Sequence, residues 1–84
     1  MDHVVYVLEC GDGSLYTGYT TDLERRLCEH ERGDGAKYTR GRTPLEVVHV
    51  ERYDSKSEAM SREYEIKQLT RERKERLVEG ENGD

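Results

Sequence analysis

Apolar residues are concentrated in three short segments of the chain, each with the composition of a β-strand. Residues 4–8 (VVYVL) are apolar and β-branched, residues 15–20 (LYTGYT) are rich in tyrosine and threonine, and residues 46–53 (EVVHVERY) contain three valines. Between the first two lies the sequence GDGS at 11–14, whose residues tolerate positive φ. The first two segments are therefore predicted to form a β-hairpin.

Three helices are predicted from capping residues and from apolar positions at helical spacing. Thr21 or Asp22 can cap the first helix, the sequence SKSE at 55–58 forms a capping box for the second, and Thr70 can cap the third. The expected elements are strands at about 3–9, 15–20 and 46–53, and helices at about 22–31, 56–69 and 71–78.

The predicted order β-β-α-β-α-α indicates an α+β fold in which helices pack on a small three-stranded sheet. A chain of 84 residues without repeats or a linker is expected to form one domain, residues 1–84, with one modest core. Residues 80–84 are polar and are expected to be a frayed tail.

The composition is polar, with 32% hydrophobic and 39% charged residues. No apolar run approaches the roughly 20 residues of a membrane-spanning helix, and no signal sequence is recognised, so we expect a cytoplasmic protein without membrane contact. Cys10 and Cys28 lack the spacing of a zinc site and are expected to be free, half-buried thiols.

The net charge is −5, with 19 acidic residues against 14 basic ones, of which only four are lysines. Such an acidic, lysine-poor surface would suit a cytoplasm of high salt concentration, which we state as a hypothesis. The charge also argues against strong nonspecific binding of nucleic acid, because phosphate-binding surfaces are normally basic. Any nucleic-acid contact is therefore expected to be local.

The segment at 35–45 (GAKYTRGRTPL) is the one local concentration of positive charge. Lys37, Arg40 and Arg42 occur there without an acidic residue, and Tyr38 lies among them. Phosphate contact and base stacking would use these residue types. An ordinary solvated loop explains the segment equally well.

In the first helix, Leu23 and Leu27 mark the buried side. Arg26 and His30 lie beside that side, four residues apart, whereas Arg25 points to solvent. Arg26 could simply cover apolar surface with its aliphatic stem, and His30 could be a hydrogen-bonded histidine at the helix end. Both residues are also candidates for a site.

The second helix has a carboxylate near the middle of its apolar side. Glu63 holds that position, and the apolar side is defined by Ala59, Met60, Ile66 and Leu69. A charge on a buried face must be paired or bind a cation. Lys67 could pair with it at i+4. Alternatively, Glu63 could bind Mg²⁺, which proteins often hold through one carboxylate, waters and a substrate phosphate.

Tyr6 and Tyr16 occur on neighbouring predicted strands and could face the same side. Two half-buried sheet tyrosines are common, so this pattern is not specific by itself. Gly18 is less ordinary, because a glycine inside a strand often marks close approach by another backbone or a ligand.

Together these residues resemble the GIY-YIG nuclease superfamily. The two half-motifs read VVY at 4–6 and YTG at 16–18, which keep the tyrosines and the final glycine. Arg26 and His30 match the family's residues on the first helix, and the sequence AMSRE at 59–63 resembles the segment with its metal-binding glutamate.

The resemblance covers about residues 3–79 and is strongest to the small stand-alone members, in which a loop like GAKYTRGR at 35–42 also occurs. It implies a three-stranded antiparallel sheet flanked by helices and cleavage of DNA with one divalent cation.

Carried over residue by residue, the resemblance assigns five catalytic candidates. Glu63 would hold Mg²⁺ or Mn²⁺, and Tyr16, with Tyr6 beside it, would position or deprotonate the attacking water. Arg26 would stabilise the charge that builds on the phosphoryl group, and His30 would assist proton transfer or orient the phosphate. Because a free tyrosine has a pKa near 10, a tyrosine acting as a base needs an adjacent cation.

We therefore expect a divalent-metal-dependent DNA endonuclease or phosphodiesterase related to DNA repair or recombination. It would read DNA structure rather than sequence, and a protein partner could supply specificity. The substrate-binding candidates are Gly18, Lys37, Tyr38, Arg40 and Arg42. The alternatives are a nucleic-acid-binding module with little turnover, a nuclease subunit that needs its partner, and a protein-interaction adaptor.

Overall fold

The computed structural model describes residues 2–79, apart from the side chain of Tyr38. The predicted tail at 80–84 lies outside this range. The elements are the strands β1 (His3–Glu9), β2 (Leu15–Thr20) and β3 (Glu46–Tyr53), the helices α1 (Leu23–Glu31), α2 (Lys56–Gln68) and α3 (Arg71–Glu79), and a short 3₁₀ helix η1 (Lys37–Thr39). The predicted element order and α+β class are confirmed, and η1 was not predicted.

The helices begin at the capping residues that the sequence offered. The side chain of Asp22 accepts a hydrogen bond from the backbone N–H of Arg25, and that of Ser55 accepts one from the backbone N–H of Glu58. Thr70 does the same for Arg73 before α3. These bonds satisfy N–H groups that a helix leaves free in its first turn.

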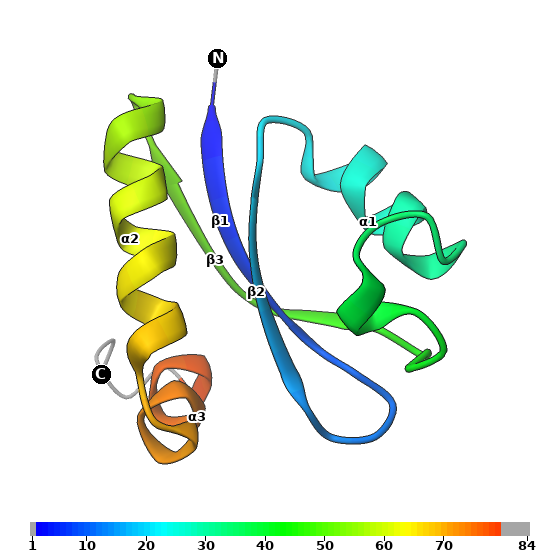
Figure 1. Ribbon diagram of the computed structural model, residues 1–84. Helices are drawn as coiled ribbons and strands as arrows, with labels where there is room; N and C mark the ends of the chain where they lie inside the picture. The colour runs from blue at the N-terminus through cyan, green and yellow to red at the C-terminus, as the bar shows by residue number, and fades with distance from the viewer. Residues whose placement is uncertain (1, 80–84) are drawn as a thin grey trace.

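The three strands form an antiparallel sheet in the order β2-β1-β3. The central strand β1 pairs Tyr6 with Gly18 of β2 and with Val50 of β3. Helix α1 lies on one side of the sheet, while α2 and α3 lie on the other (Figure 1). Strand β2 is an edge strand and passes between α1 and α2.

Strand β1 is buried on both of its faces, which explains why its sequence is a continuous apolar run. Val5 and Val7 pack in a cluster with Ala59 and Ile66 of α2. Tyr6 and Leu8 point the other way, into a cluster that Leu23 and Leu27 of α1 complete, together with Cys10, Tyr16, Leu45 and Val47. The alternation of β1 therefore directs Tyr6 towards α1.

Two expectations about single residues were wrong. Met60 is 40% exposed, because Ala59 and Ile66 define the buried direction of α2 and Met60 lies about 100° further round the helix than Ala59. The two cysteines are free, but they are not half-buried: Cys10 is buried and Cys28 is exposed. Among residues 2–79, no helix is long and apolar enough to cross a membrane.

Candidate active site

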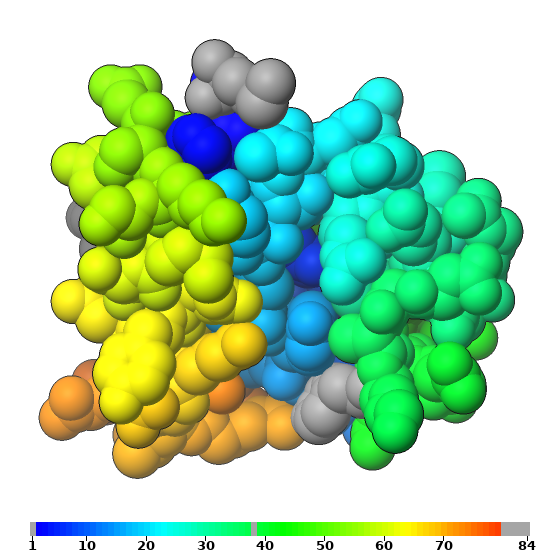
Figure 2. All heavy atoms as spheres, turned by 45° about the horizontal axis from the view of Figure 1, so that its top comes forward, coloured from blue at the N-terminus to red at the C-terminus, as the bar shows by residue number. Residues whose placement is uncertain are grey.

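A hollow runs between α1, with the loop that follows it, and α2, and β2 forms its floor (Figure 2). The five catalytic candidates come from the elements around this groove. Tyr6 is on β1, Tyr16 on β2, Arg26 and His30 on α1, and Glu63 on α2. Segments up to 57 residues apart in the sequence therefore meet in one region of the molecule.

The ring of Tyr6 is buried and lies directly over Gly18, its partner across the β1–β2 ladder. A Cβ atom added to Gly18 would lie 2.5 Å from Cζ of Tyr6, far inside van der Waals contact. The close approach that the strand glycine indicated is thus made by a side chain of this protein. Gly18 provides the space in which Tyr6 sits.

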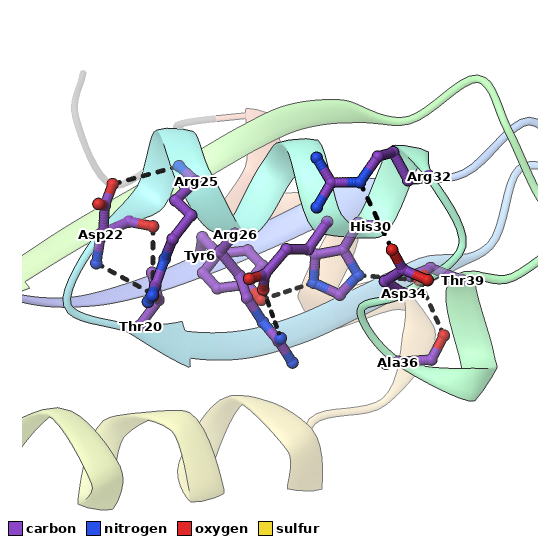
Figure 3. A network of polar contacts seen from close by, with 11 residues as sticks. Tyr6, Thr20, Asp22, Arg25, Arg26, His30, Arg32, Asp34, Ala36 and Thr39 are labelled. Carbon is purple, nitrogen blue, oxygen red and sulfur yellow. Dashed lines mark hydrogen bonds and ion pairs between the residues drawn. The ribbon is translucent and has the colours of Figure 1, made fainter.

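His30 is fully buried at the end of α1, and both of its ring nitrogens are engaged (Figure 3). Nε2 lies 2.8 Å from the Tyr6 hydroxyl, and Nδ1 lies 2.8 Å from Oγ1 of Thr39. Burial, and then the charge of Arg26, lower the pKa of His30. The imidazole is therefore neutral near pH 7, and it is the hydrogen-bonded helix-end histidine that the sequence left open.

Burial raises the pKa of the Tyr6 hydroxyl to about 12, although hydrogen bonding to Arg26 acts in the opposite direction. The nearby groups Tyr16 and Glu63 raise it further through their charge. Tyr6 is consequently protonated at physiological pH. The cation beside it does not make it a ready base, so Tyr6 is better suited to position its neighbours.

Tyr16 is the more accessible of the two tyrosines. It is half-buried on β2, and its ring centroid lies 6.4 Å from that of Tyr6 and 5.3 Å from that of His30, in tilted and edge-on contacts. The expectation that Tyr6 and Tyr16 share one side of the sheet is confirmed. This packing leaves Tyr16 between the groove and the buried rings of Tyr6 and His30.

Arg26 is half-buried, and its guanidinium is held by two neighbours. Nη1 donates to Oε1 of Glu29 at 3.0 Å. Hydrogen bonds to Glu29 and to Tyr6 raise the pKa of Arg26, so its charge is permanent. Glu29 was not predicted, although its i+3 spacing from Arg26 is a recognisable signal of a helix pair.

Glu63 is 14% exposed on the groove side of α2, and Nζ of Lys67 lies 3.2 Å from its Oε2. The predicted i, i+4 bridge is therefore present. Lys67 is 48% exposed, so a cation arriving from solvent could replace it without leaving a buried charge unpaired. Within residues 2–79, no three His, Cys, Asp or Glu residues are grouped as metal ligands. The donor set fits a hard cation that takes one carboxylate and completes its shell with water and phosphate oxygens.

The basic loop contributes exposed cations and one buried support. Lys37 and Arg40 are exposed, whereas Arg42 pairs with Asp12 of the β1–β2 turn. Thr39 is fully buried against His30, a contact that the sequence analysis missed. Gly35 was missed too: a Cβ atom there would lie 2.8 Å from Cγ of His30. The loop therefore closes over the histidine.

The candidates thus fall into two layers. Tyr6, His30 and Thr39 form a buried, uncharged layer, and Tyr16, Arg26 and Glu63 are partly exposed above it. Only the second layer can touch a molecule in the groove without rearrangement. This arrangement could hold a cation at Glu63 and an anion at Arg26, next to the phenol of Tyr16.

A family model described as the GIY-YIG catalytic domain matches residues 2–76. A UPF0213 protein of Natronomonas pharaonis is 68% identical over 82 residues, which covers 98% of this chain and 96% of the relative. A UPF0213 protein of Halobacterium salinarum is 68% identical over 75 residues, 89% of this chain and 97% of the relative.

Two solved structures are also similar. The solution NMR structure of a UPF0213 protein from Bacillus halodurans is 57% identical, with a TM-score of 0.64, and the match covers 99% of this chain and 88% of that one. The solution NMR structure of a protein from E. faecalis is 45% identical, with a TM-score of 0.69 and coverage of 100% and 90%. The chain belongs to the GIY-YIG nuclease family and, within it, is closely related to the small UPF0213 proteins.

Proposed function

We propose that this chain is a divalent-metal-dependent DNA endonuclease of the kind that acts in DNA repair or recombination. One observation supports this most strongly: Tyr16, Arg26 and Glu63, from three different elements, are the partly exposed groups over a buried neutral layer. Phosphodiester cleavage needs a positioned water, a positive charge at the phosphoryl oxygens and a site for a cation.

Each accessible residue has one task in this proposal. Glu63 would hold Mg²⁺ or Mn²⁺, and the bound cation would supply charge neutralisation at a phosphate oxygen. Tyr16 would position the attacking water and, once its own phenolic proton has passed to solvent, accept a proton from that water. Arg26, fixed by Glu29 and Tyr6, neutralises the charge that develops on the phosphoryl group.

The buried residues support this task without meeting the substrate. Tyr6 and His30 are both uncharged near pH 7 because burial opposes their ionisation. They add no negative charge beside Arg26, and hydrogen bonding to Tyr6 helps to hold its guanidinium. Of the two roles expected for His30, contact with the phosphate is disfavoured by its full burial.

DNA would lie along the groove, with the basic loop beside it. Lys37 and Arg40 are exposed and available for phosphate contact. With a net charge of −5 the surface offers few such contacts. Affinity for plain duplex would accordingly be modest, and we propose that DNA structure, or a protein partner, selects the site of cleavage.

The second candidate is a nucleic-acid-binding module with little turnover. The ion pair between Glu63 and Lys67 favours it, because this pair occupies the carboxylate that the nuclease needs. Binding would then depend on the loop and on Tyr16, and not on a metal.

Cleavage of labelled branched, flapped and plain duplex DNA with Mg²⁺ or Mn²⁺ separates the two candidates. Glu63→Gln should abolish cleavage and spare binding. Glu65→Gln is the matched control, since this glutamate lies two residues away on the exposed side of α2. If wild type cuts no substrate, or if both variants cut equally well, the nuclease proposal fails and the binding module replaces it.

A further inference from the structure

Thr39 ends a chain of hydrogen bonds that begins at Tyr6. Its hydroxyl donates to the carbonyl oxygen of Ala36 at 3.1 Å, and its Oγ1 lies 2.8 Å from Nδ1 of His30. A threonine hydroxyl has a single proton to donate. With that proton directed at Ala36, Oγ1 can only accept from His30, so Nδ1 must carry the imidazole proton.

The other end of the chain requires the same arrangement. The Arg26 guanidinium lies close enough to the Tyr6 hydroxyl to lower its pKa through hydrogen bonding and charge, and it has only donors. The Tyr6 oxygen therefore accepts from Arg26 and directs its own proton at Nε2 of His30, 2.8 Å away. Nε2 must then be unprotonated, which again places the single imidazole proton on Nδ1.

Packing holds the imidazole ring of His30 in place beside its two hydrogen-bond partners. Gly35 lies against the Nδ1 side of the His30 ring. A Cβ atom added to Gly35 would be 2.8 Å from Cγ and 2.9 Å from Cε1 of that ring. The rings of Tyr6 and Tyr16 contact His30 edge-on, with centroids at 5.9 Å and 5.3 Å. Because the ring cannot move aside, its tautomer decides which way the hydrogen bonds run.

We propose that Thr39 is a positioning residue that fixes His30 as the Nδ1–H tautomer and so makes Tyr6 an acceptor for Arg26. Without the threonine oxygen, the imidazole proton could move to Nε2 and face Tyr6. The phenolic proton of Tyr6 would then point towards Arg26, so that two hydrogen-bond donors would face each other. Arg26 would then lose the contact with Tyr6 that orients its guanidinium, and DNA cleavage would slow. This expected effect on turnover rests on the proposed function.

The tautomer itself can be measured in the wild-type protein. ¹⁵N chemical shifts and ring proton correlations of His30 distinguish an Nδ1–H from an Nε2–H imidazole, and Tyr6→Phe assigns the signal through the loss of its partner. We expect Nδ1–H at neutral pH. An Nε2–H imidazole in the folded wild type would overturn the proposal, and this result does not depend on any nuclease activity.

Three variants connect the tautomer with turnover. Thr39→Val keeps the shape and removes the oxygen, Thr39→Ser keeps the oxygen, and Thr43→Val is the control at an exposed threonine of the same loop. We expect Thr39→Val to lose the pure Nδ1–H signature and to slow single-turnover cleavage about 10- to 100-fold with unchanged DNA affinity. Thr39→Ser and Thr43→Val should keep the Nδ1–H signature and the wild-type cleavage rate.

The outcomes are distinguishable. If Thr39→Val keeps the Nδ1–H signature, or cleaves at the wild-type rate after losing it, Thr39 has no positioning role. If Thr39→Val fails to fold, the wild-type tautomer and the rate of Thr39→Ser decide in its place. If no variant cleaves DNA, the proposed function fails while the tautomer measurement still tests what Thr39 does to His30.

Discussion

At the residue scale, the site separates groups that are buried and neutral from groups that are accessible and charged. Tyr6 and His30 share one hydrogen bond of 2.8 Å in the interior, and Arg26 and Glu63 carry opposite charges nearer the groove. A phenol and an imidazole stay neutral when buried because a low-dielectric surrounding penalises their charged forms. The buried pair therefore positions the site without altering its charge.

Thr17 offers a test of the packing beneath the site. Its hydroxyl is buried on β2 and has no hydrogen-bond partner among residues 2–79. Thr17→Val keeps the β-branched shape and removes a polar group that gains nothing from burial, so we expect the free energy of unfolding to rise by about 1 kcal/mol. Urea denaturation measures the change. Destabilisation would instead show that the hydroxyl has a partner, such as water.

Lys67 should compete with the metal for Glu63, because its ammonium lies 3.2 Å from the carboxylate. We expect Lys67→Met to lower the Mn²⁺ concentration that gives half-maximal cleavage, severalfold, since the cation no longer displaces an ion pair. Lys56→Met is the control at the exposed start of the same helix. A higher metal requirement in Lys67→Met would mean that the lysine assists the site.

At the scale of elements, β3 and α2 are joined by a half-buried carboxylate. Glu51 of β3 accepts hydrogen bonds from Nε and Nη2 of Arg62 on α2, at 2.8 Å and 3.1 Å, and from Tyr53 at 2.6 Å. Nε2 of His49 lies 2.7 Å away, and Glu65 shares Arg62. This cluster fixes the helix that carries Glu63 to the sheet that carries Tyr16.

Glu51 should therefore control stability in acid. Burial alone would raise its pKa, but hydrogen bonds from Arg62, Tyr53 and His49 outweigh burial and lower the pKa from 4.5 to about 2. A lowered folded-state pKa gives stability that is complete above pH 4.5 and is lost as the pH falls towards 2.

Replacing Glu51 by Gln tests this dependence. We expect Glu51→Gln to lower the free energy of unfolding at pH 7 by on the order of 3 kcal/mol and to flatten its decline in acid. Glu46→Gln, at the exposed start of the same strand, is the control. Thermal unfolding between pH 7 and pH 2 is the measurement, and parallel curves for wild type and Glu51→Gln would contradict the assignment.

The elements could be predicted from the sequence because their signals are local. The three helices begin at residues that can cap them, which are Asp22, Ser55 and Thr70. Strand β1 is a continuous apolar run because it is buried on both of its faces. The 3₁₀ helix η1 was missed because three residues carry no periodicity. The exposure of Met60 was missed because one methionine at the border of an apolar stripe does not fix the helix rotation.

The site could be predicted only in part, for the same physical reason. The spacing of Arg26 and His30 along α1 placed both beside the buried side. The structure leaves Arg26 half-buried, as expected, but buries His30 completely. The contacts of His30 with Gly35 and Thr39 depend on how a loop without periodicity folds back over the helix end. Likewise, the cluster around Glu51 depends on how α2 docks against β3, which no local pattern specifies.

At the scale of the whole molecule, charge is the dominant property. A net charge of −5 on 84 residues, 39% of them charged, implies repulsion that salt can screen. The Debye length falls from about 10 Å at 0.1 M salt to about 3 Å at 1 M. Salt should therefore stabilise the fold while it weakens phosphate contacts.

We expect the free energy of unfolding to increase between about 0.1 and 1 M KCl, over the range in which screening becomes short. Glu31→Lys with Glu79→Lys, two exposed positions at the ends of α1 and α3, reduces the negative net charge and should lessen the need for salt. Urea denaturation at several KCl concentrations gives the comparison. Stability that does not change up to molar salt would remove the high-salt hypothesis.

The most direct test of the proposed site is the single-turnover rate of DNA cleavage with Mn²⁺ for wild type, Tyr16→Phe and Tyr6→Phe. Wild type should cleave, and removing the hydroxyl of the half-buried Tyr16 should slow cleavage about 10²- to 10⁴-fold, as expected for a group that accepts a proton in the reaction. Removing the buried hydroxyl of Tyr6 should slow it by about tenfold, as expected for a residue that positions others. A wild-type rate in Tyr16→Phe, or no metal-dependent cleavage by folded wild type, would contradict the assignment of this groove as a nuclease site.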